Sequence, residues 1–183
     1  MLVVAEREQL PVRAARAGSS EAWDALFKRY QMPLYVYVFE LVHNEQSSLD
    51  MVQETFINAA RHIGKLREDA KFGSWLFGIA HQKCIQLWRE KKREQDWRDQ
   101  FHETKADFDD DPAELLIRKE QELEFMTLLE RLPLPQRSVL LLHFIENFSL
   151  EAIAAITATE VGTVKSRMHY GKKAFRKLIQ EQK

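Results

Sequence analysis

Cations and hydroxyls alternate near the C-terminus of the sequence, in a pattern suited to contacts with DNA. Lys165 and Arg167 can reach phosphates or guanine edges. Thr163 and Ser166 can hydrogen-bond to bases or to the sugar-phosphate backbone. Lys172 and further basic residues extend the positive charge along the chain. A polyanion such as DNA is therefore one candidate partner of this segment.

A helix-turn-helix is the element that would position these side chains. Ser149 is predicted to cap a short helix, residues 157–159 to form a turn, and Glu160 to open a second helix. The inward face of the second helix carries three apolar residues: Val161, Val164 and Met168. The polar residues lie mostly off that face, as they do in a DNA-reading helix. A solvated basic hairpin shows the same pattern, so the pattern alone leaves both interpretations open.

A second polar group surrounds an aromatic residue in the first half of the sequence. Asp50, Gln53 and Glu54 come shortly before Phe56. Acidic and amide groups around an apolar residue suit a basic, amphipathic partner helix. The alternative is a solvated pair of Asp50 and Glu54, with Phe56 packed in the core and Leu49 on the same inward face.

A third group, from residue 66 to residue 93, combines aromatic rings with cations. Rings can hold an unstacked base, at about 1–3 kcal/mol per base, and the rings available are Phe72, Trp75 and Trp88. Trp75 is more typical of a core residue, because apolar neighbours share its helix face. The better candidates for phosphate contacts are Lys83, Arg89, Lys91, Lys92 and Arg93. These cations could instead offset the macrodipole at a helix end.

Helical periodicity in the first half predicts the scaffold for both groups. We expect a helix from Ser20, an interruption at Pro33, a second helix ending at Val42, a third after a polar break, and a long fourth from Phe72 to the basic run 91–93. No segment alternates with period two for long enough to require a strand. The sequence therefore predicts an all-α fold.

Composition limits the class of protein. The 183 residues are 45% hydrophobic and 30% charged, which is typical of a globular protein rather than a disordered chain. A single cysteine, Cys84, excludes an internal disulfide and a Cys-rich zinc site. The apolar runs are too short to span a bilayer, and the N-terminus lacks a signal-peptide pattern. We expect a cytoplasmic protein without direct membrane insertion.

Charge divides the sequence into three parts. Residues 1–94 carry a net charge of +2, residues 95–130 of −8 and residues 131–183 of +5. A near-neutral head, an acidic middle and a basic tail indicate parts with different partners, and the basic tail favours DNA.

An acidic linker is predicted between two domains. Asp107 and the run Asp109–Asp111 repel one another, which resists packing. The prediction is two small helical domains, residues 1–95 and 114–183, joined by a flexible acidic linker at residues 96–113. The second domain would be a helix-turn-helix (winged-helix-like) DNA-binding domain.

Together, these motifs resemble the extracytoplasmic-function (ECF, group IV) sigma factors of the sigma-70 family. The resemblance rests on Gly162-Thr163-Val164-Lys165-Ser166-Arg167, Leu132-Pro133 and Ser149-Leu150-Glu151 in the second domain, and on Asp50 to Ile57 and Phe72-x-x-Trp75-Leu76 in the first. Two unlinked motif sets in the expected order are more specific than either set alone. The resemblance covers residues 14–178.

The resemblance implies that the two domains share the work of promoter-specific transcription initiation. The first domain would grip the β′ clamp helices of the RNA polymerase core through Asp50, Gln53, Glu54 and Phe56. It would capture the −10 element through Lys71, Phe72, Ser74, Lys83, Arg89, Lys92 and Arg93. The second domain would touch the β flap and read the −35 element through Arg137, Thr163, Lys165, Ser166, Arg167 and Lys172.

The resemblance also implies a regulatory partner. Family members are commonly held inactive by an anti-sigma factor, often membrane-anchored, so a position at the inner membrane face is implied as well. No cofactor, metal or small-molecule substrate is expected. The acidic linker could occupy the RNA-exit path of the polymerase, repel DNA from the free protein, or serve as a solvated spacer.

The sequence departs from the family pattern at DNA-facing positions. Ala158 stands in the turn where Gly is usual, and a left-handed conformation there would cost Ala about 1–2 kcal/mol. Gly171 loosens the last helix, and His81 stands where Arg is usual in the promoter-melting helix. These departures leave the family assignment intact and the promoter sequence open.

Two other classes of function are weighed against this interpretation. An enzyme is disfavoured, because the six histidines are scattered and the sequence has no HExxH motif, Cys/His cluster or Walker loop. A stand-alone helix-turn-helix regulator shares the C-terminal motif but needs neither the Asp50–Phe56 nor the Phe72–Arg93 segment. Tight binding to core polymerase with poor binding to free promoter DNA would distinguish a sigma factor from such a regulator.

Overall fold

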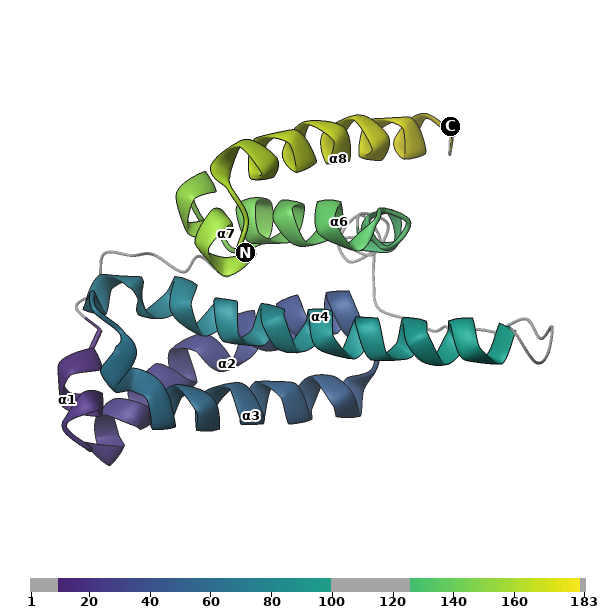
Figure 1. Cartoon of the computed structure of the whole chain (residues 1–183). Coiled ribbons are helices and arrows are strands. Elements are labelled where there is room, and N and C mark those ends of the chain that lie inside the picture. The colour runs from purple at the N-terminus through teal and green to yellow at the C-terminus, as the bar shows by residue number, and fades with distance from the viewer. Residues whose placement is uncertain (1–9, 100–125, 182–183) are drawn as a thin grey trace, which may run out of the picture.

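Helices dominate residues 10–99 and 126–181, which are the residues that the computed structural model describes (Figure 1). The N-terminal half, residues 10–99, contains α1 (Val12–Arg16), α2 (Ser20–Val42), α3 (Glu45–His62), two single-turn helices (Ile63–Lys65 and Asp69–Lys71) and α4 (Phe72–Asp99). The C-terminal half, residues 126–181, contains α6 (Leu134–Leu140), a π-helical turn (Leu141–Ile145), α7 (Leu150–Ile156) and α8 (Val161–Glu181). Neither of these ranges contains a strand, which confirms the predicted all-α fold.

Side-chain caps set the beginnings of several helices. The Ser19 hydroxyl accepts a hydrogen bond from the Ala22 N–H (3.2 Å) at the start of α2. The Ser149 hydroxyl does the same for the Ala152 N–H (3.2 Å) at the start of α7, as predicted. Each cap satisfies a backbone donor that has no partner within the helix. At the other end of α2, His43 adopts a left-handed conformation (φ 51°) and ends the helix.

The predicted interruption at Pro33 is wrong, because α2 runs unbroken from Ser20 to Val42. A proline inside a helix costs about 3 kcal/mol or more, since it removes a hydrogen bond and crowds the preceding turn. Pro33 is itself buried, and its neighbours Leu34 and Tyr37 are 0% and 1% exposed. Burial of this face of α2 offsets the local cost.

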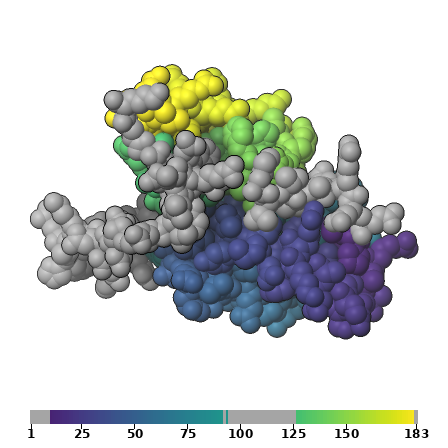
Figure 2. All heavy atoms as spheres, turned by 180° about the vertical axis from the view of Figure 1, so that it is seen from behind, coloured from purple at the N-terminus to yellow at the C-terminus, as the bar shows by residue number. Residues whose placement is uncertain are grey.

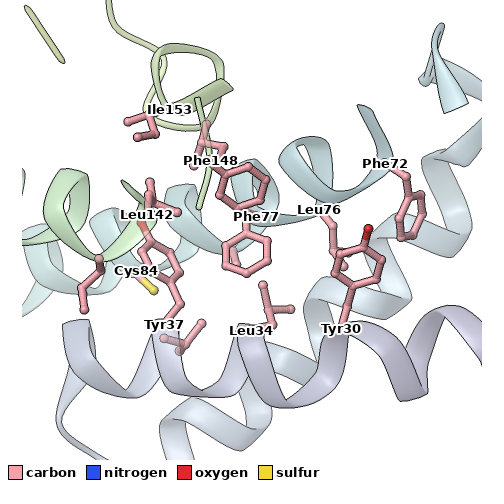
Figure 3. Packing of buried hydrophobic residues seen from close by; sticks show 14 of the residues in the cluster. Tyr30, Leu34, Tyr37, Phe72, Leu76, Phe77, Cys84, Leu142, Phe148 and Ile153 are labelled. Carbon is pink, nitrogen blue, oxygen red and sulfur yellow. The ribbon is translucent and has the colours of Figure 1, made fainter. Parts of the chain in front are cut away.

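The two halves pack against each other through α4. One side of α4 contacts α2 and α3, and the other side contacts α7 (Figure 1). Seen from behind, the green-to-yellow C-terminal half lies above the purple-to-blue side chains of the N-terminal half (Figure 2). A single cluster of buried residues runs through both halves; Figure 3 labels Tyr30, Leu34, Tyr37, Phe72, Leu76, Phe77, Cys84, Leu142, Phe148 and Ile153 within it.

The predicted acidic linker falls largely outside the described residues. Residues 96–99 continue α4, and residues 100–113 lie outside the described ranges. Within those ranges, no helix combines the length and hydropathy needed to cross a membrane. The same ranges hold no cluster of His, Cys, Asp or Glu side chains suited to a metal ion.

Candidate functional site

The turn between α7 and α8 contains a left-handed alanine. Ala158 has φ 50°. The N–H of Thr159 donates to the carbonyl of Ala154 (3.0 Å), and the N–H of Ala158 donates to that of Ala155 (3.4 Å). This pattern is the Schellman motif, in which glycine usually takes the left-handed position. Ala158 is therefore left-handed, and it bears the conformational strain expected for an alanine in that conformation.

The outer face of α8 presents most of the predicted −35 side chains to solvent. Thr163, Lys165 and Ser166 are exposed, while Val164 and Met168 are buried on the opposite face. The Ser166 hydroxyl donates to the carbonyl of Gly162 (3.1 Å), so the serine is oriented within its own helix. Lys172 lies over the Phe144 ring at 5.0 Å from the centroid. The helix thus offers a polar, cationic surface with an apolar back, as the sequence predicts.

Arg167 points to a different place, a cleft between the two halves. This cleft has a volume of about 800 Å3, and its lining includes Arg167 from α8 together with Arg89, Arg93 and Trp88 from α4. Arg89 and Arg93 are exposed, whereas Arg167 is partly buried. Candidates for the −10 and the −35 elements therefore meet at one cleft in this structure.

His81 lines the same cleft as a buried, neutral group. Its Nδ1 lies 2.7 Å from the hydroxyl of Tyr37, and the side chain is 6% exposed. Burial, together with the positive charge of Arg167, lowers the pKa of His81 to about 4. This histidine thus joins α4 to α2 by a hydrogen bond.

Three of the remaining −10 candidates are engaged in local contacts. Phe72 is 0% exposed and packs against the rings of Trp23, Tyr30 and Trp75. Lys71 forms an ion pair with Glu68 (2.7 Å) on the surface. The hydroxyl of Ser74 donates to the carbonyl of Lys71 (3.1 Å). The side chain of Lys92 lies outside the described residues.

The polymerase candidates lie on the outer face of α3, with one exception. Asp50, Gln53 and Glu54 are exposed, and Asp50 accepts a hydrogen bond from the Gln46 amide (3.0 Å). Phe56 is 8% exposed and packs against the ring of Phe27 at a centroid distance of 4.9 Å. The structure thus places Phe56 beneath this face rather than on it.

Sequence reasoning missed the apolar part of the α3 face. Leu49 is 48% exposed and Ile57 is 43% exposed, and both fall on the same helix face as Gln53. The prediction that Leu49 shares the inward face is wrong, whereas Val52, Phe56 and Ala59 are buried along that face as predicted. The spacing of residues 49, 53 and 57 carried this signal, since they recur every four residues outside that face.

An ion pair joins two residues predicted for different partners. The ammonium group of Lys83 on α4 lies 2.5 Å from Oε2 of Glu54 on α3. The hydrogen bond and the charge of Lys83 lower the pKa of Glu54. The structure therefore brings together a candidate for the −10 element and a candidate for the polymerase.

Arg137 joins the two halves at the C-terminal end of α2. Its Nη1 donates to the carbonyl of Glu40 (3.1 Å) and to Nε2 of His43 (2.7 Å). Its Nη2 donates to the carbonyl oxygens of Glu130 and Leu132. A guanidinium suits this place, because it donates hydrogen bonds to carbonyl groups left unpaired at a helix end. Its positive charge also interacts favourably with the helix dipole. The predicted phosphate contact would require Arg137 to leave these partners.

Comparisons with known proteins agree with both motif sets. The family model for Sigma-70 region 2 matches residues 26–94, and the model for Sigma-70, region 4 matches residues 122–175. The RNA polymerase sigma-H factor of Pseudomonas aeruginosa is 29% identical over 98% of this chain and 97% of that protein. The ECF RNA polymerase sigma factor SigW of Bacillus subtilis is 26% identical over 93% of this chain and 95% of that protein.

Solved structures show the same fold. CnrH in complex with the cytosolic domain of CnrY matches with a TM-score of 0.70 and 22% identity, over 94% of this chain and 96% of that one. The sigma factor RpoE in complex with the anti-sigma factor NepR from Bartonella quintana matches with a TM-score of 0.64 and 24% identity, over 85% of this chain and 96% of that one. Because both region models match in order and the relatives align along nearly their full length, the chain belongs to the extracytoplasmic-function group of the sigma-70 family.

Proposed function

We propose that the chain binds the RNA polymerase core and directs it to promoters through their −10 and −35 elements. One observation carries this proposal: a single core supports both an exposed acidic and apolar face on α3 and an exposed cationic face on α8. Members of this family are initiation factors rather than enzymes, so each face is explained by binding.

The α3 face suits the β′ clamp helices. Leu49 and Ile57 offer apolar area, and Asp50, Gln53 and Glu54 offer acceptors to a basic helix. Apolar anchors with charged surroundings are typical of protein interfaces, in which charge guides association and apolar burial supplies affinity. In this proposal Phe56 acts indirectly, because it supports the face from below.

The second half offers a groove for the β flap. This groove, with a volume of about 640 Å3, runs along α8 and includes Gln136 of α6 in its lining. Tyr170 contributes an exposed ring, and Lys173 and Lys177 contribute positive charge. An acidic, amphipathic segment of the polymerase fits such a lining.

Promoter contacts are proposed for α8 and for the basic end of α4. Lys165 and Arg167 are candidates for base edges or phosphates, supported by Thr163 and Ser166, and a good bidentate base contact is worth about 1–3 kcal/mol of discrimination. On α4, Arg89 and Arg93 are exposed and suit phosphates. The remaining −10 and −35 candidates stay predictions: Lys71, Phe72, Ser74, Lys83, Lys92, Arg137 and Lys172.

An anti-sigma factor is the proposed regulatory partner. The two solved structures described above are complexes, and the partner in the RpoE complex is the anti-sigma factor NepR. The cleft between α4 and the C-terminal half would accept a partner segment that touches both halves at once. Such a partner could block the polymerase and the promoter together.

The experiment that tests this proposal compares two affinities of the full-length protein. Its binding to purified core polymerase is measured by fluorescence anisotropy, and its binding to duplex promoter DNA is measured without polymerase. We expect tight binding to the core and poor binding to the duplex. A specific footprint of the free protein on duplex DNA, with no binding to the core, would instead support the stand-alone regulator.

A further inference from the structure

The ion pair between Lys83 and Glu54 connects the proposed polymerase face to the proposed DNA helix. The ammonium nitrogen and the carboxylate oxygen lie 2.5 Å apart, and the side chains are 21% and 63% exposed, respectively. Lys83 is thus largely covered, while Glu54 projects into solvent. A partner that approaches α3 would reach the carboxylate before it reaches the lysine.

The core beneath the pair fixes the spacing of the two helices. Cys84, the neighbour of Lys83, is 2% exposed, and its Sγ lies 4.0 Å from Sδ of Met51. Met51 lies one turn before Glu54 on α3, and the hydroxyl of Thr55 donates to its carbonyl (2.6 Å). Packing of α3 against α4 therefore positions the backbones, and the ion pair decides where the ammonium group lies.

Asp50 provides a comparison for Glu54, because it is an exposed acid of the same helix that is not paired with Lys83. It lies one turn earlier on the same outer face, and it accepts a hydrogen bond from Gln46 of its own helix (3.0 Å). Both acids are exposed, and both belong to the predicted polymerase motif. They differ in their partners, because Glu54 forms an ion pair with Lys83 of α4, whereas Asp50 accepts a hydrogen bond within its own helix.

We propose that Glu54 is a positioning residue that holds Lys83 against the bundle in the free protein and releases it to DNA when a cation of the polymerase binds the carboxylate. This inference rests on the proposed function, which assigns the carboxylate to the polymerase and the ammonium group to the promoter. A second cation at the carboxylate weakens the attraction for the first, because the two like charges repel. Binding of polymerase and DNA would then be linked, each strengthening the other by the same factor.

The expected size of this coupling is modest. Exposed ion pairs are weak and are screened by salt, so release of Lys83 changes DNA affinity by at most about fivefold. A weak ion pair suits a switch of this kind, since the polymerase can displace Lys83 without opening the core. A phosphate contact by Lys83 carries no sequence information, so the coupling acts on every promoter alike.

The test measures the binding of the free, full-length protein to a fluorescent, mixed-sequence single-stranded DNA by anisotropy. Glu54→Gln keeps the side-chain shape and removes the charge that holds Lys83. We expect this variant to bind about twofold to fivefold more tightly than the wild type. The plot of log affinity against log salt should steepen by about 0.7, the value for one added phosphate contact on a single strand. Adding Lys83→Met should abolish both effects.

Asp50→Asn is the matched control, because it removes the same charge from the same face. It should raise affinity less than Glu54→Gln does and should leave the salt slope unchanged. An equal gain in both variants, or a gain that survives Lys83→Met, overturns the proposal. Lys83→Met in the wild-type background gives an independent measurement: it should hardly change DNA binding by the free protein, and a clear loss contradicts the proposal even if Glu54→Gln fails to fold.

Binding of the wild type to core polymerase, measured in parallel, distinguishes a failure of the proposed function from a failure of the coupling. A wild type that binds no core contradicts the proposed function. A wild type that binds core normally, combined with no gain in Glu54→Gln, contradicts the coupling alone.

Discussion

Phe77 of α4 and Phe148, which follows the π-helical turn, lie edge to face with ring centroids 5.1 Å apart (Figure 3). Beside them, α7 approaches α4 closely at Gly78, where an added Cβ would stand 3.8 Å from Cα of Ile156. Edge-to-face rings of this kind add to the free energy gained from burial. The contact joins the two helical domains through one shared core.

Replacing Phe148 with Ala should lower the free energy of unfolding by about 3–5 kcal/mol, because a buried ring is lost and a cavity remains. Urea unfolding followed by circular dichroism measures this change. The wild type should unfold in one transition, since both halves contribute to one core, whereas the variant should show two. Phe148→Leu, which keeps more of the volume, should lose less. A loss below about 1 kcal/mol for Phe148→Ala would show that the halves do not depend on this contact.

Replacing Ala158 with Gly should raise the free energy of unfolding by about 1 kcal/mol, because glycine adopts the left-handed conformation without the Cβ penalty. Thermal unfolding measures the gain as a higher Tm. Ala155→Gly is the control, since this exposed residue lies within α7 and should instead cost up to about 1 kcal/mol. Losses in both variants would contradict the strain assigned to Ala158.

Glu146 should make stability fall as pH rises. The residue is 1% exposed and neither carboxylate oxygen has a hydrogen-bond partner, and burial raises its pKa to about 8. Between the ordinary carboxyl pKa and about 8, the folded protein holds a proton that the unfolded chain releases. The stabilising contribution is therefore complete below the ordinary pKa and is lost as pH rises through about 8.

Unfolding free energies measured across this pH range test the effect of Glu146. Glu146→Gln should flatten the decline with pH, because the amide does not titrate. Part of the decline should remain, since burial also raises the pKa of Glu40, to about 7. Glu151→Gln, at an exposed position of α7, should retain the wild-type profile. An unchanged decline in Glu146→Gln would contradict the buried, protonated state.

Replacing Leu49 and Ile57 together with Ser should weaken binding to core polymerase by about tenfold or more, because two half-exposed apolar anchors are lost from the α3 face. The fold should stay intact, since both residues face solvent. Anisotropy with labelled core measures the affinity. Met32→Ser is the control: Met32 is 52% exposed and lies about 140° around α2 from Phe27, the ring that packs on α3. Equal losses in both proteins would contradict the assignment of this face.

Local chemistry made much of the fold predictable. The cap at Ser149, the turn at residues 157–159 and the inward position of Val164 follow from propensity and periodicity, which act over a few residues. The strained position of Ala158 was also foreseeable, because the usual residue there is glycine. Such features depend little on the rest of the molecule.

Other features depend on distant residues and could not be derived from local patterns. Pro33 remains within a helix whose neighbouring residues Leu34 and Tyr37 are buried, and the Tyr37 ring packs against Phe77 of α4. Arg137 has the chemistry of a phosphate contact, yet its partners come from the end of α2, far away in the sequence. The pairing of Lys83 with Glu54 likewise depends on how α3 and α4 pack. Periodicity assigns a face to each helix and leaves the partner of that face undetermined.

Run-off transcription tests directly whether the chain guides RNA polymerase to promoters. Purified core polymerase is combined with the full-length protein on a library of genomic DNA fragments, and the transcript ends are sequenced. We expect transcripts that start at defined sites only when the protein is present, and a loss of these starts in the Lys165→Ala, Arg167→Ala double variant. Start sites that are unchanged by adding the protein would show that the chain does not direct the polymerase to promoters.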